Sequence, residues 1–303
     1  MAAAPMIEHA LPPVPFKRVL VPTDFSSCSE RALGYTLAIC AACRAQIFIL
    51  HVLPPESPAT PQTVADFVSH RFGCTLYQAE KHIRSLENSG VLSKVEHSIL
   101  LLKGDLRDMV ESSIPRLGID LIVIGTHGRG GVKKLFLGSI AEAVSRQSPC
   151  AVLIVGPHAR PAWPDFAFRH ILYATEYSSG SLSALRYALS LAQQCRADLT
   201  LLHVCGFLEG GPFVDNQTVV QHERERLKSL LPEHLQLASP PKLVARLGII
   251  SDTILRTAAE SDADLIVMGA RPAHSLTAAT HSPWSVEHQI VCHAACPVLT
   301  VRG

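Results

Sequence analysis

The sequence lacks the features that mark two common kinds of partner. It contains no block of basic residues, and its 303 residues carry a formal net charge of +1 at pH 7. This argues against nucleic acid or an anionic membrane surface as the main partner. No apolar run approaches the roughly 20 residues of a membrane span. The N-terminal stretch MAAAPMIEHALPPVPFKR lacks the basic start and apolar core of a secretion signal, so we expect a disordered leader there.

Common catalytic and nucleotide-binding motifs are also missing. No G-x-x-x-x-G-K-[ST] occurs, which excludes a Walker-type site, and no G-x-G-x-x-G follows the first expected strand, which disfavours a Rossmann dehydrogenase. Neither a G-x-S-x-G elbow nor an H-E-x-x-H pair is present. The nine cysteines are odd in number and lie in apolar stretches such as LAICAAC. Reduced, buried thiols in a cytoplasmic protein are therefore expected.

The chain contains the same pattern twice. FKRVLVPTDFSSCSERALGYTLAICAACRAQIFILHVL, which begins at Phe16, is matched by FRHILYATEYSSGSLSALRYALSLAQQCRADLTLLHVC, which begins at Phe168. The later stretches GIDLIVIGTHG and DADLIVMGARP also correspond. With 48% hydrophobic residues, each half can form a core. We expect domains at 16–156 and 168–303, joined by a Pro- and Ala-rich linker at 157–167.

Each half predicts an α/β fold. Short apolar runs without polar alternation, such as RVLVPT, IFILHVL and AVLIV, suit strands that are buried on both faces. Helical stretches such as SERALGYTLAICAACR separate them. Alternating strands and helices predict two tandem open parallel sheets with helices on both faces. Such sheets bind ligands beyond the carboxyl ends of the strands, where the strand order reverses.

Two predicted strand ends carry unusual residues. The first ends in VPTD, and the fourth runs into GTHGRGGVKKLFLGS, from Gly125 to Ser139. A carboxylate suits ribose hydroxyls or an adenine amine, and a glycine loop that opens a helix suits phosphates. The alternatives are that Asp24 caps the helix that begins near Ser27 and that the glycines form a plain surface loop.

The spacing Gly125-x2-Gly128-x9-Gly138-Ser139 resembles the ATP-binding signature of the universal stress protein family. VPTD, the HVL at the end of the second strand and CAVLIV in the fifth fit the same family. The resemblance covers nearly the whole chain, once in each half. It implies two Rossmann-like five-stranded sheets of order 3-2-1-4-5. It also implies an intramolecular pseudo-dimer through the fifth strands, with a further homodimer left open.

The resemblance also assigns residues to a bound ATP, with Mg²⁺ accompanying it. The adenosine end would contact Pro22, Thr23, Asp24 and the backbone of Val52. The ribose and phosphates would be lined by Gly125, Thr126, His127 and Gly128. The phosphate tail would contact Gly138, Ser139 and Ile140. Arg129 either balances the triphosphate or is merely solvated.

The second half departs from this pattern. Asp24 becomes Glu176, the second glycine becomes Pro272, and Ser282-Pro283 lies near the position of Gly138-Ser139. Proline removes an N–H donor, so we expect no ATP there. The cluster of histidines and cysteines near the C-terminus fits no standard zinc spacing, and the run HERERLKS reads as a solvated helix face.

These features favour a nucleotide-binding regulator that responds to stress. ATP would act as a switch for an unknown regulatory protein partner, without a catalytic residue, since no base or nucleophile accompanies the loop. A slow Mg-dependent ATPase or phosphotransferase is the second hypothesis. A nucleotide-independent docking module is the third.

Overall fold

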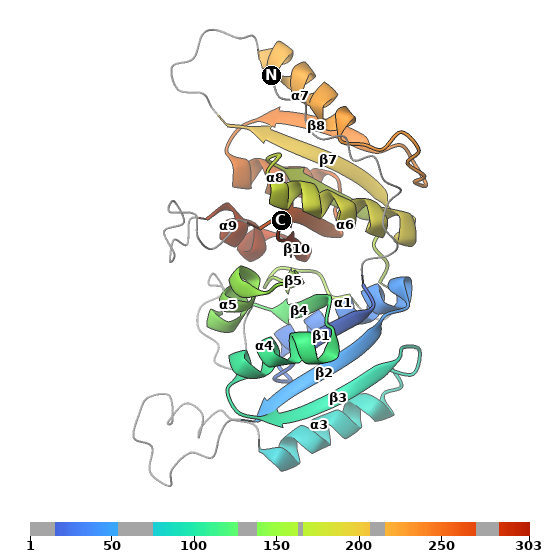
Figure 1. The fold of residues 1–303 in the computed structure, drawn as a ribbon, viewed down its shortest axis with the longest axis vertical. Coiled ribbons are helices and arrows are strands. Elements are labelled where there is room, and N and C mark those ends of the chain that lie inside the picture. The colour runs from blue at the N-terminus through green and yellow to red at the C-terminus, as the bar shows by residue number, and fades with distance from the viewer. Residues whose placement is uncertain (1–15, 54–74, 127–137, 163–165, 207–215, 271–284) are drawn as a thin grey trace. The chain divides into compact units, whose positions relative to one another are not determined.

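The computed structural model describes residues 16–53, 75–126, 138–162, 166–206, 216–270 and 285–303. The chain divides into two compact units, one formed by Phe16–Phe166 and the other containing Ala167–Gly303. We call them the N-terminal and the C-terminal domain. Each is an open parallel sheet with helices on both faces (Figure 1), as the sequence predicts.

The N-terminal sheet has five strands in the order β3-β2-β1-β4-β5. Their bounds are β1 Arg18–Pro22, β2 Gln46–Leu53, β3 His97–Lys103, β4 Leu121–Gly125 and β5 Ala151–Val155. Every pairing in this sheet is parallel. The predicted order 3-2-1-4-5 is therefore confirmed. Because β1 lies between β2 and β4, the strand order reverses at the carboxyl ends of β1 and β4.

In the described ranges, four helices belong to this domain, with α4 and α5 on one face of the sheet and α1 on the other (Figure 1). Their bounds are α1 Ser27–Cys43, α3 Leu76–Asn88, α4 Leu106–Leu117 and α5 Ser139–Gln147. Side chains cap three of them: Ser26 accepts from the N–H of Ser29, Thr75 forms a capping box with Gln78, and Asp105 accepts two N–H groups. Such caps satisfy N–H groups that lack intrahelical acceptors.

The segment predicted as a linker packs against α1 where it is described. The Tyr35 hydroxyl donates to the carbonyl of Arg160 at 2.7 Å, and Arg31 Nη1 donates to the carbonyl of Pro157 at 3.0 Å. A Cβ on Gly34 would lie 3.1 Å from the carbonyl oxygen of Ala162. Residues 157–162 are thus part of the N-terminal domain.

The C-terminal domain repeats this architecture, with strand order β10-β9-β6-β7-β8. Its strands are β6 His170–Thr175, β7 Asp198–Cys205, β8 Lys242–Leu247, β9 Leu265–Gly269 and β10 Val298–Val301. Its helices are α6 Ser179–Cys195, α7 Asn216–Ser229, α8 Ile250–Glu260 and α9 Val286–His293. Strand for strand, this is again the order 3-2-1-4-5.

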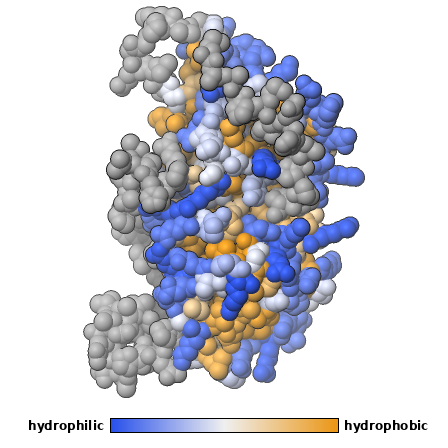
Figure 2. Space-filling model, viewed as in Figure 1, coloured by the Kyte–Doolittle hydropathy of each residue, from blue (hydrophilic) through white to orange (hydrophobic). Residues whose placement is uncertain are grey.

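The cores lie along the central strands. Residues Val19–Val21 and Leu121–Val123 are fully buried, which explains why these strands show no polar alternation. The edge strand β3 differs, because its residues 98–102 are only half-buried. Figure 2 shows apolar surface, in orange, over the part of the N-terminal domain where β2 and β3 lie. None of the helices in the described ranges is long and apolar enough to cross a membrane.

Candidate functional site

The carboxyl end of β1 forms a tight turn held by side chains. The N–H of Phe25 donates to Thr23 Oγ1 at 3.0 Å, and the N–H of Ser26 donates to Asp24 Oδ1 at 3.0 Å. The N-cap of α1 is Ser26. The alternative reading of Asp24 as the N-cap is therefore wrong. Asp24 instead shapes the turn that precedes the cap.

Histidine 51 ties the end of β2 to this turn. Its Nδ1 donates to the carbonyl of Thr23 at 2.7 Å, and the N–H of Thr23 donates to the carbonyl of Leu50 at 2.8 Å. The Phe25 ring lies 4.6 Å from the imidazole, centroid to centroid. Val52, the predicted adenine contact, follows in β2 and is half-buried. These contacts hold the ends of β1 and β2 next to each other.

Phe25 adopts the left-handed conformation, with φ at +59°. A bulky residue rarely does so, because the cost is on the order of 1–3 kcal/mol. The conformation turns the chain sharply between β1 and α1 and places the ring over His51. Phe25 and His51 were not among the predicted site residues, although both have matched counterparts in the other half.

The glycines at the β4 end are required by close packing. A Cβ on Gly125 would lie 3.0 Å from the carbonyl oxygen of Cys28, and a Cβ on Gly138 would lie 2.7 Å from that of Thr126. The N–H of Gly138 donates to the same Thr126 carbonyl at 2.8 Å. These contacts join the end of β4 to the start of both α1 and α5. Close packing of the backbone therefore requires glycine at both positions, whether or not a ligand binds.

The N-terminus of α5 differs from the other helices of its domain. Its N-cap is Gly138, which has no side chain to accept a hydrogen bond from the first turn. The first N–H groups of a helix have no intrahelical acceptor and carry a partial positive charge. This helix end is thus suited to an anion, and Ile140 lies half-buried in its first turn. Ser139 is the first residue of α5.

Three of the predicted site residues, His127, Gly128 and Arg129, lie outside the described residues. The other predicted positions fall at the ends of β1, β2 and β4 and at the start of α5, and they are Pro22, Thr23, Asp24, Val52, Gly125, Thr126, Gly138, Ser139 and Ile140. The close contact between Gly125 and Cys28 links the β4 group to the β1–α1 turn. The predicted residues thus gather at one edge of the sheet.

The C-terminal domain repeats the β1–β2 part of this arrangement. The N–H of Tyr177 donates to Thr175 Oγ1 at 3.0 Å, and His203 Nδ1 donates to the carbonyl of Thr175 at 2.8 Å. Tyr177 has φ at +61°, and its ring lies 4.6 Å from that of His203. The strained aromatic turn is thus a feature of both halves.

The C-terminal counterpart of α5 has a side-chain cap. The helix that matches α5 is α9, and its N-cap Ser285 accepts from the N–H of His288 at 3.2 Å. The structural counterpart of Gly138-Ser139 is therefore Ser285-Val286, whereas the sequence comparison pointed to Ser282-Pro283. Pro272, Ser282 and Pro283 lie outside the described residues. Glu176 is exposed, while Asp24 is half-buried.

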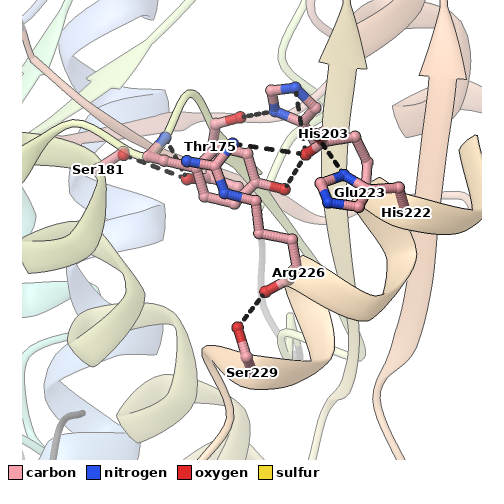
Figure 3. Close-up of polar contacts among 8 residues, drawn as sticks. Thr175, Ser181, His203, His222, Glu223, Arg226 and Ser229 are labelled. Atoms are coloured by element: carbon pink, nitrogen blue, oxygen red, sulfur yellow. Dashed lines mark hydrogen bonds and ion pairs between the residues drawn. The ribbon is translucent and has the colours of Figure 1, made fainter. Parts of the chain in front are cut away.

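One charged cluster was missed in the sequence. Glu223 belongs to the run HERERLKS, which was read as a solvated helix face, yet its side chain is only 13% exposed. It accepts a hydrogen bond from the Tyr177 hydroxyl at 2.9 Å and lies 3.8 Å from both His203 Nε2 and Arg226 Nη1. Figure 3 shows His203, Glu223 and Arg226 gathered between β7 and α7. The prediction of a solvated helix face is therefore wrong for Glu223.

Among the described residues, no group of three or more His, Cys, Asp or Glu side chains is arranged to hold a metal ion. The described thiols are free, and several are shielded from water. Burial raises the pKa of Cys195 to about 11 and, together with the neighbouring Cys43, raises that of Cys40 further. Thiols with such raised pKa values are poor nucleophiles at neutral pH.

The fold and the strand-end geometry define a class of protein: a duplicated open-sheet α/β protein with its candidate site at the strand-order reversal. The model of the universal stress protein family matches residues 15–156 and again 167–302. The chain therefore belongs to the universal stress protein family, with two tandem domains.

Individual relatives agree with this. A universal stress protein of Thermus aquaticus is 31% identical over 141 residues, which is 46% of this chain and 98% of that protein. The universal stress protein YxiE of Bacillus subtilis is 29% identical over 147 residues, covering 46% of this chain and 99% of the relative. Among solved structures, a universal stress protein from Archaeoglobus fulgidus superposes with a TM-score of 0.69 at 20% identity, covering 94% of this chain and 98% of that one. That likeness shows a shared fold.

Proposed function

We propose that the N-terminal domain binds an adenine nucleotide, ATP with Mg²⁺, and that this stress-family protein uses it as a regulatory switch. The turn at Thr23 and Asp24 and the end of β2 at Val52 would hold the adenosine. The glycine loop, including His127, Gly128 and Arg129, would line the ribose and phosphates. The phosphate tail would meet the N-terminus of α5.

One observation carries this proposal: the difference between matched helix ends. The N-cap of α5 is Gly138, which has no side chain to cap the helix, while α9 is capped by Ser285. An anion bound at α5 meets N–H groups that the N-cap residue leaves without a side-chain acceptor, whereas at α9 it would compete with a serine hydroxyl. The proposal therefore assigns one nucleotide to each chain.

Titration calorimetry with MgATP tests this site. We expect one equivalent per chain, with Asp24→Asn weakening the affinity about tenfold or more, because a charged hydrogen bond contributes about 1.5–3 kcal/mol. Asparagine keeps the oxygen that accepts from the N–H of Ser26, so the turn is preserved. Ser139→Ala should weaken binding in the same direction, through loss of the predicted hydroxyl contact.

The matched control is Glu176→Gln, at the corresponding position of the C-terminal domain, and it should leave the affinity unchanged. Two equivalents of ATP per chain, or an equal loss in both variants, would contradict the proposal. Bulky substitutions at Gly125 or Gly138 are unsuited to this purpose. Their Cβ atoms would meet backbone at 3.0 and 2.7 Å, so such changes disturb the fold as well as a ligand.

A further inference from the structure

Two matched positions differ between the halves in a complementary way. Phe25 corresponds to Tyr177, and the α3 residue Ala79 corresponds to the α7 residue Glu223. The second match follows from ring contacts: His82 stacks on Phe25 with centroids 4.7 Å apart, and Arg226 lies over the Tyr177 ring at 3.7 Å. Each stacking residue comes three positions after the compared one. The C-terminal domain thus gains a hydroxyl donor and a carboxylate acceptor together.

The two added groups bond to each other. The Tyr177 hydroxyl donates to Glu223 Oε2 at 2.9 Å, and His222 Nδ1 lies 3.4 Å from Oε1 of the same carboxylate. Arg226 contacts both partners, since its guanidinium covers the tyrosine ring and its Nη1 lies 3.8 Å from Glu223. Hydrogen bonds to a shielded carboxylate are stronger than those between neutral groups in water.

Burial and the carboxylate act on the tyrosine in the same direction. Desolvation, followed by the hydrogen bond and charge of Glu223, raises the pKa of Tyr177 well above its ordinary value. The hydroxyl therefore remains a donor throughout the neutral and mildly alkaline range. Figure 3 shows that Glu223 and Arg226 both reach from α7 toward the strand that carries His203.

Helix α7 buries little of its own surface. Leu227 is its one buried residue, and the rest of its described surface is exposed or half-exposed. The helix nevertheless packs against β7 and β8. In the N-terminal domain, α3 likewise buries one residue, Ala79.

We propose that Tyr177, Glu223 and Arg226 form a latch that pins α7 to the carboxyl ends of β6 and β7. The latch joins segments 46 residues apart in sequence, as the separation of Tyr177 and Glu223 shows. The side chains of the latch occupy the region that corresponds to the adenosine end of the proposed N-terminal site. This last consequence rests on the proposed function, whereas the latch itself does not.

Hydrogen–deuterium exchange of the full-length protein, without nucleotide, tests the latch. The double variant Tyr177→Phe/Glu223→Ala introduces the residue types that the N-terminal domain has at these two positions. It removes the donor and the acceptor of the Tyr177–Glu223 hydrogen bond together, so that neither of the two is left buried without the other. We expect amides of α7 to exchange at least about tenfold faster, while those of β6 and β7 keep their wild-type rates. Glu225→Ala is the matched control, because Glu225 lies on the exposed side of the same helix, and it should leave α7 exchange within about twofold of wild type.

Unchanged exchange of α7 in the double variant would overturn the latch. So would an equal increase in β6, β7 and α7, which indicates general destabilisation, or an equal effect of Glu225→Ala. Tyr177→Phe alone removes one oxygen and provides a milder variant, for which a smaller increase confined to α7 is expected. Because no nucleotide is present, the result does not depend on whether the N-terminal domain binds ATP.

Discussion

At the scale of single residues, the left-handed aromatic residue after the first strand of each domain organises the site region. Phe25 and Tyr177 share this conformation and the contact with a histidine. The hydrogen bonds that their N–H groups donate to Thr23 and Thr175 offset the strain of this conformation. The partners of the aromatic residue on α3 and α7 differ, because Tyr177 bonds to Glu223 of α7, whereas the matched α3 residue is Ala79.

Tyr173 is expected to make stability depend on alkaline pH. Its side chain is fully buried, and burial raises its pKa to about 12, against about 10 in an unfolded chain. A raised folded-state pKa means that the stabilisation is complete below pH 10 and is lost as the pH rises through 12. The expected loss is about 3 kcal/mol, measured as the free energy of unfolding in urea between pH 9 and 12.

The variants Tyr173→Phe and Tyr77→Phe distinguish this cause from general alkaline damage. Tyr173→Phe should lose less stability over this range, because the titrating group is gone. Tyr77 is 76% exposed, so Tyr77→Phe should follow the wild type. Identical pH curves for wild type and Tyr173→Phe would show that this phenol does not contribute.

At the scale of elements, the two domains treat one helix N-terminus differently. Asp105 caps α4 by accepting from the N–H groups of Arg107 at 2.9 Å and Asp108 at 3.2 Å. The matching position before α8 is Ile249, which offers no acceptor and is 62% exposed. Isoleucine is among the poorest N-cap residues. The C-terminal domain is therefore less stable at this end than its counterpart.

Ile249→Asp should consequently stabilise the C-terminal domain by about 1 kcal/mol, and Asp105→Ala should destabilise the N-terminal domain by a similar amount. Little burial is lost in the first change, because the isoleucine is largely in solvent. Urea unfolding, followed separately for each domain, provides the measurement. A destabilising Ile249→Asp would mean that this side chain packs against another part of the molecule.

At the scale of the whole molecule, duplication has produced two domains with the same fold and different site regions. The N-terminal one keeps an uncapped α5, and the C-terminal one has a capped α9 and the cluster at Glu223. This asymmetry is the reason why the proposed nucleotide site is assigned to the N-terminal domain alone. Packing of the domains through their fifth strands, and a further homodimer, stay predictions.

Hydrolysis of ATP by the purified protein should be slow or absent, far below the order of 10 per second typical of enzymes. The strand ends supply hydrogen-bond donors, and the imidazole of His51 is buried and bonded to Thr23. A steady-state assay with MgATP checks this. Turnover at ordinary enzyme rates would contradict the regulatory proposal, and His127→Ala would then test whether that histidine takes part.

Local sequence pattern determined the fold and much of the candidate site. Apolar runs without alternation marked the buried strands, the repeat marked two domains, and glycine spacing marked the end of β4. These features are readable because strand burial and helix capping act over a few neighbouring residues. The order 3-2-1-4-5 followed from the family resemblance, since many orders are compatible with alternating strands and helices.

Only the tertiary structure decided what depends on residues far apart in the chain. It seats residues 157–162 on α1, brings Gly138 against Thr126, and turns Glu223 inward to meet Tyr177. It also replaces Ser282-Pro283 by Ser285-Val286 as the counterpart of the phosphate end. The sequence HERERLKS does not indicate which of its charged residues will contact the Tyr177 hydroxyl, because that contact forms only when the helix packs against its sheet.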